Sequence, residues 1–186
     1  DVFVSLAKSY VFSSLAQKRA EYEKTHEGRP VISLGIGDAV LPLIPALKTA
    51  FDKLSSELVT EEGFVGYGDS QGVLALRKKL ATDYYKAVVD ADEVFISNGA
   101  KGLLAQLQNF FSHTTSVGIV TPTYPVYADG SRLQGINQIH HLPLTEENQF
   151  YYDLEKAPKV DLVYLCYPNN PTGTVMSKEQ LTKWVQ

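Results

Sequence analysis

Three short stretches of this sequence combine turn-forming residues with side chains that could bind a ligand. They are NGAKG at residues 98–102, TPTYPVY at residues 121–127 and NNPTG at residues 169–173. Each follows an apolar run that predicts a strand, namely EVFIS, SVGIV and VDLVYLCY. In an open α/β sheet, ligands bind in the loops at the carboxyl ends of the strands. We therefore expect the three stretches to contribute to one binding site.

The first stretch predicts an anion site. A strand ending at Ser97, followed by Gly99 and a helix that begins near Ala100, directs unpaired backbone N–H groups and the positive end of the helix dipole at one place. A phosphate suits such a place. Lys101 supports this interpretation, because the helix dipole disfavours a lysine in the first turn unless an anion lies nearby. The alternative is a solvated surface lysine after an ordinary Asn-Gly turn.

In the second stretch, Tyr124 is the side chain of interest. Pro122 precedes it by two residues and Pro125 follows it directly, so the backbone is restricted on both sides of the ring. A ring held in this way at a strand end could stack on a flat cofactor. The alternative is a hydrophobic plug whose hydroxyl reaches the surface, and the sequence alone leaves both open.

The third stretch presents an asparagine amide. Asn170 precedes Pro171, which favours extended backbone, and Thr172 with Gly173 completes a turn. The Asn170 amide would then be a fixed donor at the edge of the sheet. The alternative is that Asn-Pro and Thr-Gly only punctuate a loop, as they do in many proteins.

The apolar spacing predicts the elements that must position these residues. Helical spacing is found at residues 11–26, 47–58, 73–87 and 99–111, in a short segment at 124–135, and at 177–186, where Ser177 and Gln180 have the spacing of a capping box. Strands are expected at residues 93–97, 116–121, 136–144 and 160–167. The alternation from residue 93 onward predicts a three-layer α/β/α domain with a mainly parallel sheet.

Composition excludes several classes of protein. With 186 residues, of which 44% are hydrophobic, the chain can bury one core and is neither collagen-like, disordered nor membrane-spanning in composition. A net charge of -4 without a cluster of like charges argues against nucleic-acid binding and favours a small ligand. The single cysteine, Cys166, predicts a packed thiol in a reducing compartment, either the cytoplasm or the stroma of a reducing organelle.

Metal, nucleotide and acyl-transfer chemistries have weaker support. His140 and His141 are adjacent in a predicted strand, so their side chains point to opposite faces and cannot easily share a metal. The GIGDAV stretch at residues 35–40 begins like a dinucleotide fingerprint but lacks its last glycine. There is no zinc pattern, nucleophile elbow or phosphate-binding loop with a lysine.

In this order, the motifs resemble the pyridoxal-phosphate enzymes of the aspartate aminotransferase superfamily, which have fold type I. The similarity runs from about Tyr10 to Gln186 and includes GIGD, GYGDSQGVLALR, ISNGAK, TPTYPVYAD and YPNNPTGTV. Within the superfamily, YVF, GAK and PTYPVY resemble the LL-diaminopimelate aminotransferase group. The resemblance implies that residues 1–45 are an N-terminal arm and a segment of the small domain. It implies that residues 46–186 are the N-terminal part of the large cofactor-binding domain.

The resemblance assigns five residues to the cofactor, pyridoxal 5'-phosphate. The backbone of Ala100 and Lys101 would bind its phosphate, and Tyr67 would reach the phosphate of the neighbouring subunit's cofactor. Tyr124 would stack on the pyridine ring. Asn170 would hydrogen-bond the phenolic oxygen of the ring. A homodimer with shared active sites follows from the role of Tyr67.

The resemblance also assigns five residues to the substrate. Lys101, Tyr124 and Asn170 would contact it from the cofactor site, with Asn170 helping to hold its carboxylate. Gly37 would let the backbone approach that carboxylate, since glycine has no side chain. Tyr10, on the N-terminal arm, would reach the substrate across the dimer interface.

The family pattern continues past the NPTG loop, and this sequence ends at Gln186. The lysine that binds the cofactor covalently, the carboxylate that pairs with the ring nitrogen and an arginine for the substrate lie downstream in the family. We expect no metal in the site, a chain that is inactive by itself, and no replacement of the missing lysine by Lys101, because that residue is placed at the phosphate end.

Two local departures bear on the substrate and the phosphate site. The diaminopimelate enzymes carry Glu or Gln where Leu41 stands here, and leucine cannot accept a hydrogen bond from the distal ammonium of that substrate. Asn98 replaces the usual Asp beside backbone phosphate contacts, which we interpret as neutral.

The expected activity is amino-group transfer between an amino acid, of which LL-diaminopimelate is one candidate, and 2-oxoglutarate, in amino-acid biosynthesis such as that of lysine. Two alternatives remain. One is a catalytically silent protein with the aminotransferase fold in a structural or regulatory role, and the other is a lyase that uses the same cofactor.

Overall fold

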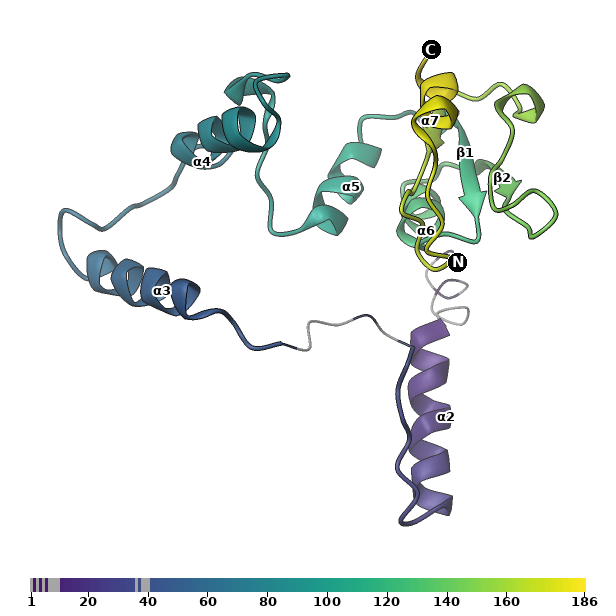
Figure 1. The fold of residues 1–186 in the computed structure, drawn as a ribbon, viewed down its shortest axis with the longest axis horizontal. Coiled ribbons are helices and arrows are strands. Elements are labelled where there is room, and N and C mark those ends of the chain that lie inside the picture. The colour runs from purple at the N-terminus through teal and green to yellow at the C-terminus, as the bar shows by residue number, and fades with distance from the viewer. Residues whose placement is uncertain (1, 3, 5, 7–10, 36, 38–40) are drawn as a thin grey trace. The chain divides into compact units, whose positions relative to one another are not determined.

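The chain divides into two units in the computed structural model, which describes residues 2, 4, 6, 11–35, 37 and 41–186 (Figure 1). One unit comprises Val11–Ile96, and the other comprises Ser97–Gln186 together with Asp1–Tyr10. The predicted boundary between residues 45 and 46 separates the small and large domains of the family. It stays a prediction. Each unit is described by itself.

The Val11–Ile96 unit is helical. It contains α2 (Val11–Thr25), α3 (Pro45–Leu58) and α4 (Leu74–Lys79), followed by a π-helical segment, Leu80–Tyr84, and a short 3-10 helix, Ala91–Glu93. Proline at the first position of α3 suits a helix start, because its missing N–H has no helical partner there in any case. The three helices predicted from apolar spacing are therefore confirmed, with the third ending in a π-helical turn.

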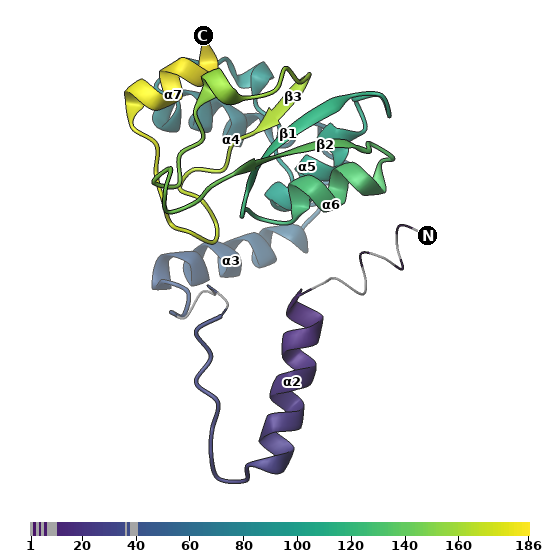
Figure 2. The same ribbon diagram turned by 90° about the vertical axis from the view of Figure 1, so that its right-hand side faces the viewer.

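The second unit alternates helices and strands along Ser97–Gln186. It contains α5 (Ala100–Gln108), β1 (Ser116–Thr121), α6 (Val126–Leu133), β2 (Gln138–Pro143), the 3-10 helix Leu154–Lys156, β3 (Leu162–Tyr164) and α7 (Lys178–Val185). The strand order is β2-β1-β3, and β1 pairs in parallel with both neighbours (Figure 2). The predicted parallel sheet is confirmed.

Alternating side chains of the strands form two cores, one on each face of the sheet. On one face, Val117, Ile119 and Tyr164 are buried against residues of α5 and α6, including Leu104 and Tyr127. On the other face, buried Val120 and Leu142 pack with Trp184 of α7, and with Val163 and Leu165. Because neighbouring residues of a strand face opposite sides, helices cover both faces, as a three-layer α/β/α arrangement requires.

One predicted strand is wrong and another is shorter than expected. Residues 94–97 form no strand in the described structure, because the backbone of Ile96 donates to Gln71 O in a loop, at 2.9 Å, and joins no ladder. β3 covers only Leu162–Tyr164, because Cys166 and Tyr167 already belong to the loop that follows.

The last helix begins as the capping-box spacing predicts. Ser177 Oγ accepts from the Gln180 backbone N–H at 3.2 Å, and Gln180 Oε1 accepts from the Ser177 backbone N–H at 2.8 Å. This reciprocal pair satisfies two donors that would otherwise lack partners at the start of α7. It also ends the preceding loop at a defined residue.

Candidate functional site

The loops that follow β1 and β3 leave the same edge of the sheet. These two strands pair in parallel, with Val117 opposite Leu162 and Ile119 opposite Tyr164, so their carboxyl ends are neighbours. The first loop carries Tyr124 and the second carries Asn170. The sheet therefore brings two of the sequence-predicted site residues to one edge.

A buried asparagine, Asn169, ties the two loops together. Its side-chain N–H groups donate to Pro122 O at 2.9 Å and to Thr172 Oγ1 at 2.9 Å, while its Oδ1 accepts from Thr123 Oγ1 at 3.0 Å. Only 3% of Asn169 is exposed. An unpaired amide would be costly to bury, so losing any of these hydrogen bonds would be unfavourable. The bonds to Pro122 and Thr123 therefore hold the two loops together.

Two residues next to these contacts are more exposed than Asn169. Asn170 is exposed, and Tyr124, which directly follows Thr123, is half-buried. The Thr121–Pro122, Tyr167–Pro168 and Asn170–Pro171 peptide bonds of the two loops are cis. The structure thus places an aromatic ring and an amide on neighbouring loops with a shared anchor.

The start of α5 supplies backbone donors. Gly99 precedes the helix with φ 116° and ψ 152°, a conformation that side chains disfavour, and no side chain caps the helix. A Cβ added at Gly99 would meet no atom within 4 Å, and Ala100 and Lys101 are both exposed. The free N–H groups of this first turn suit an anion.

The other end of α5 is fastened to α6. Gln108 is 1% exposed, and its Nε2 donates to Tyr127 O at 3.3 Å and to Ser131 Oγ at 3.5 Å. Gly130 permits this approach, because a Cβ there would lie 2.2 Å from Gln108 Oε1. α5 is therefore anchored to α6, the helix that follows the Tyr124 loop.

Tyr127 lies on α6, three residues after Tyr124, and stays protonated. Its ring stacks on Tyr164 with centroids 5.0 Å apart. Burial, and then the Cys166 sulfur beside its hydroxyl, raise the pKa of Tyr127 to about 12. At neutral pH the group can donate a hydrogen bond and cannot serve as a base. Cys166 itself is half-buried, as the packed-thiol prediction stated.

In the helical unit, Tyr67 is fully exposed and belongs to a loop that Arg77 fastens. Arg77 is 3% exposed and donates to Gly72 O at 3.0 Å and to Asp69 Oδ2 at 2.8 Å. The pKa of Asp69 is lowered by the Gln71 backbone N–H and by the Arg77 guanidinium. The exposed Tyr67 thus lies two residues before Asp69, which Arg77 binds.

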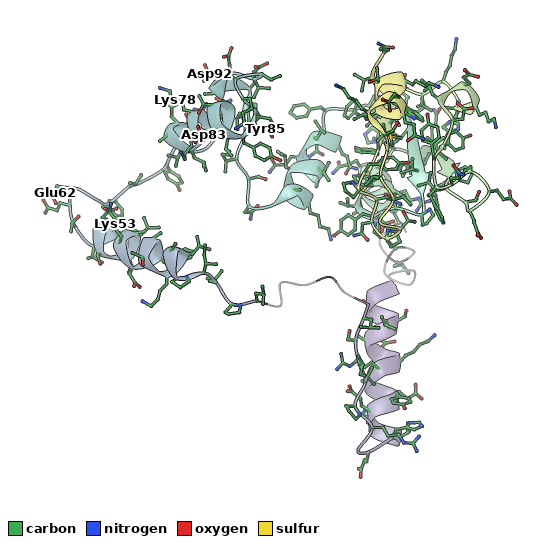
Figure 3. All side chains as sticks on the ribbon, viewed as in Figure 1. Lys53, Glu62, Lys78, Asp83, Tyr85 and Asp92 are labelled. Carbon is green, nitrogen blue, oxygen red and sulfur yellow. The ribbon has the colours of Figure 1, made fainter. Side chains whose placement is uncertain are left out.

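Arg77 also holds the segment that precedes residue 94. Its Nη1 donates to Ala91 O at 2.9 Å and lies 3.3 Å from Asp92 Oδ1, on the exposed side chain labelled in Figure 3. Because four acceptors surround one guanidinium, this buried arginine has partners for most of its donors.

Of the remaining predicted residues, Gly37 is exposed, with open space around its α-carbon, and Leu41 is 82% exposed. Tyr10 lies outside the described residues. The two units are described separately, so the structure tests no contact between Tyr67 or Gly37 and the sheet edge. These assignments stay predictions.

Within the described residues, no group of three His, Cys, Asp or Glu side chains could hold a metal. His141 Nδ1 lies 3.0 Å from Thr121 Oγ1, and His140 is exposed on the same strand. None of the described helices is long and apolar enough to cross a membrane.

The sequence interpretation overlooked Asn169. Its signal was present, because an asparagine that precedes a turn can bond both to its own loop and to a neighbouring one. Its backbone N–H donates to Thr174 O at 2.8 Å, and its carbonyl accepts from Gly173 N at 2.7 Å. What could not be read from the sequence is that Pro122 and Thr123 lie beside it.

The chain is similar to known proteins along most of its length. The family model described as aminotransferase class I and II matches residues 29–186. The LL-diaminopimelate aminotransferase of Desulfosudis oleivorans is 41% identical and that of Parabacteroides distasonis is 37% identical, each over 98% of this chain. The chain spans about half the length of these relatives, 47% in both cases.

Solved structures agree with this similarity. L,L-diaminopimelate aminotransferase from Chlamydomonas reinhardtii is 37% identical, with a TM-score of 0.85, and the match covers 95% of this chain and 46% of that one. A double mutant of the Thermus thermophilus aspartate aminotransferase is 22% identical, with a TM-score of 0.78, and shares the fold. The parallel sheet flanked by helices is thus part of an aminotransferase domain of fold type I.

Proposed function

This chain belongs to the class I and II aminotransferase family, and on that basis we propose that it forms the N-terminal part of a pyridoxal-phosphate-dependent aminotransferase. The observation that carries the proposal is the pairing of β1 and β3, which brings the Tyr124 and Asn170 loops to one edge with Asn169 between them. The chain's 37% to 41% identity to LL-diaminopimelate aminotransferases supports it.

The donors at the sheet edge and at the start of α5 are together of the kinds that pyridoxal 5'-phosphate requires. The phosphate needs several N–H donors and little negative charge, and the uncapped first turn of α5 with Lys101 offers both. The flat ring needs an aromatic face, for which Tyr124 is available. The ring oxygen needs a neutral donor, for which the exposed Asn170 amide is suited.

We assign the roles of the residues as follows. The N–H groups of Ala100 and Lys101 bind the phosphate, and Tyr124 packs against the ring and keeps water from that side. Asn170 donates to the ring oxygen and helps to hold the substrate carboxylate. When bound, the cofactor supplies an electron sink for the charge left at the α-carbon as its proton departs. Tyr127, with its pKa of about 12, remains a neutral donor beside the site.

We propose an amino acid and 2-oxoglutarate as the substrate pair. LL-diaminopimelate is the candidate donor that the relatives' names suggest. Leu41 argues for a different donor, because a leucine there leaves a distal ammonium without an acceptor. A screen of amino donors decides, with Leu41→Glu as the comparison. If Leu41→Glu gains no activity toward diaminopimelate, this account of Leu41 is wrong.

A shared dimeric site completes the proposal. The exposed Tyr67 reaches the cofactor phosphate of the neighbouring copy, and Gly37 and Tyr10 approach the substrate. Residues 1–45 form the arm and part of the small domain, and residues 46–186 belong to the large domain. The single cysteine favours the cytoplasm or a reducing stroma as the compartment.

The test uses the protein expressed from its complete gene. We expect added pyridoxal phosphate to give a visible absorbance band that shifts when an amino donor is added, with 2-oxoglutarate restoring it. A lysine after Gln186 that can be labelled by reduction of the bound cofactor supports the same conclusion. A protein that stays colourless supports the catalytically silent alternative, and loss of substrate without amino transfer supports a lyase.

A further inference from the structure

We propose that Asn169 is a positioning residue that holds Tyr124 and Asn170 in one geometry and thereby sets the affinity for the cofactor. The inference rests on the proposed function, because it concerns the same site. Asn169 itself is 3% exposed and cannot be the ligand group that Asn170 is. Its side chain acts through the residues that flank it and that it contacts.

Asn169 forms hydrogen bonds to two consecutive residues of the Tyr124 loop. It donates to Pro122 O at 2.9 Å and accepts from Thr123 Oγ1 at 3.0 Å. Tyr124 is the next residue, so its α-carbon is one peptide plane from the second contact. A shift of Asn169 would move the backbone that aims the Tyr124 ring.

Asn169 also forms hydrogen bonds within the turn that contains Asn170. Besides Nδ2 to Thr172 Oγ1 at 2.9 Å, the backbone of Asn169 bonds to Thr174 O at 2.8 Å and to Gly173 N at 2.7 Å. These three contacts join the two ends of the turn, with Asn170 at its exposed side. The orientation of the Asn170 amide therefore depends on the same residue.

The asparagine amide matches this set of partners. Pro122 O can only accept and receives one N–H, Thr172 Oγ1 accepts the other N–H, and the Thr123 hydroxyl donates to Oδ1. Aspartate offers no donor and would direct a charge at Pro122 O. Alanine removes the amide partner of the Pro122 carbonyl and of the half-buried Thr123 hydroxyl. The amide is therefore fully used by the two loops.

The test combines two readouts on the protein expressed from its complete gene. Hydrogen exchange of the cofactor-free protein measures whether Asn169→Ala loosens residues 123–127 as well as its own turn. A titration with pyridoxal 5'-phosphate measures affinity. We expect faster exchange at both loops and an affinity loss of about tenfold. Asn137→Ala is the matched control. Asn137 is an exposed loop asparagine whose side chain donates one local hydrogen bond, to Gly135 O at 3.0 Å.

A milder variant and a double-mutant cycle separate positioning from loss of folding. Thr123→Val removes only the donor to Asn169 Oδ1, and we expect an affinity loss of about threefold with a smaller fall in melting temperature than Asn169→Ala causes. If Asn169 acts through Asn170, the loss for Asn169→Ala with Asn170→Ala should be smaller than the product of the single losses.

The outcomes distinguish this inference from the proposed function. A wild-type protein that binds no pyridoxal phosphate removes both. A wild-type protein that binds it, with Asn169→Ala and Thr123→Val retaining full affinity and slow exchange at residues 123–127, overturns the positioning role alone. Independent, multiplicative losses for Asn169→Ala and Asn170→Ala also overturn it.

Discussion

Adjacent residues of one loop have different surroundings, as Asn169 and Asn170 show. Asn169 is buried and bonded at every polar side-chain position, whereas Asn170 is exposed at the edge of the sheet. Thr123 and its neighbour Tyr124 are both half-buried, and the Thr123 hydroxyl bonds to Asn169. One residue of each pair fixes the loop, and the other is available to a ligand.

The protonation of Tyr127 predicts a decline of stability in alkali. Because the folded state raises the pKa of Tyr127 from 10.0 to about 12, its contribution to stability is complete below pH 10 and is lost as the pH rises toward 12. We expect Tyr127→Phe to flatten the fall of the free energy of unfolding across this range. Urea denaturation at several pH values measures it, and an equally steep fall in the variant would contradict this role.

At the scale of elements, the sheet and the helical unit each depend on a polar residue at a junction. Asp161 precedes β3 and accepts from the Ser116 backbone N–H at 2.8 Å and from Ser116 Oγ at 2.7 Å. It therefore ties the start of β1 to the start of β3. Arg77 on α4 plays the corresponding part between two loops.

Asp161 predicts a loss of stability in acid. The Ser116 N–H and hydroxyl lower its pKa below the ordinary 3.8, so its contribution is present above about that pH and is lost as the pH falls through the lower folded value. Asp161→Asn should reduce stability at neutral pH and weaken this acid dependence. The midpoint of urea denaturation from neutral to strongly acidic pH measures both effects. An unchanged acid dependence in the variant would show that other carboxylates cause it.

Replacing Arg77 is expected to cause a large loss of stability. Arg77→Met leaves Gly72 O and Ala91 O without their donor, and we expect the free energy of unfolding to fall by about 2 kcal/mol. Lys53→Met is the control, because its pair with Glu57, 3.7 Å away, is exposed and contributes about 0.5 kcal/mol or less. Equal effects of the two changes would mean that the Arg77 contacts add little.

At the scale of the whole molecule, the match to relatives covers about half of their length, 47% for the first two. The proposed site divides its groups between the two units of this chain. Tyr67 belongs to Val11–Ile96, whereas Tyr124 and Asn170 belong to Ser97–Gln186. In the proposed dimer, the exposed Tyr67 of one copy would serve the cofactor of the other copy.

Shared sites predict complementation between inactive variants. A dimer of Tyr67→Phe with Asn170→Ala would contain one site with both changes and one site with neither. Mixing equal amounts of the two dissociated proteins should therefore restore about a quarter of the wild-type sites. Activity and cofactor binding of the mixture, compared with each variant alone, measure this. No recovery after verified subunit exchange would show that Tyr67 serves its own chain.

The sequence by itself determined the helices, three of the four strands and the loops that carry Tyr124 and Asn170, because apolar period and turn residues are local properties. It also gave the family resemblance that the similarity to known aminotransferases confirms. The apolar run at residues 94–97 wrongly predicted a strand, because such a run forms a strand only where a neighbouring strand is available for pairing. Only the tertiary structure decided that Asn169 joins the two loops, because Pro122 and Thr123 lie 47 and 46 residues away and meet it through strand pairing.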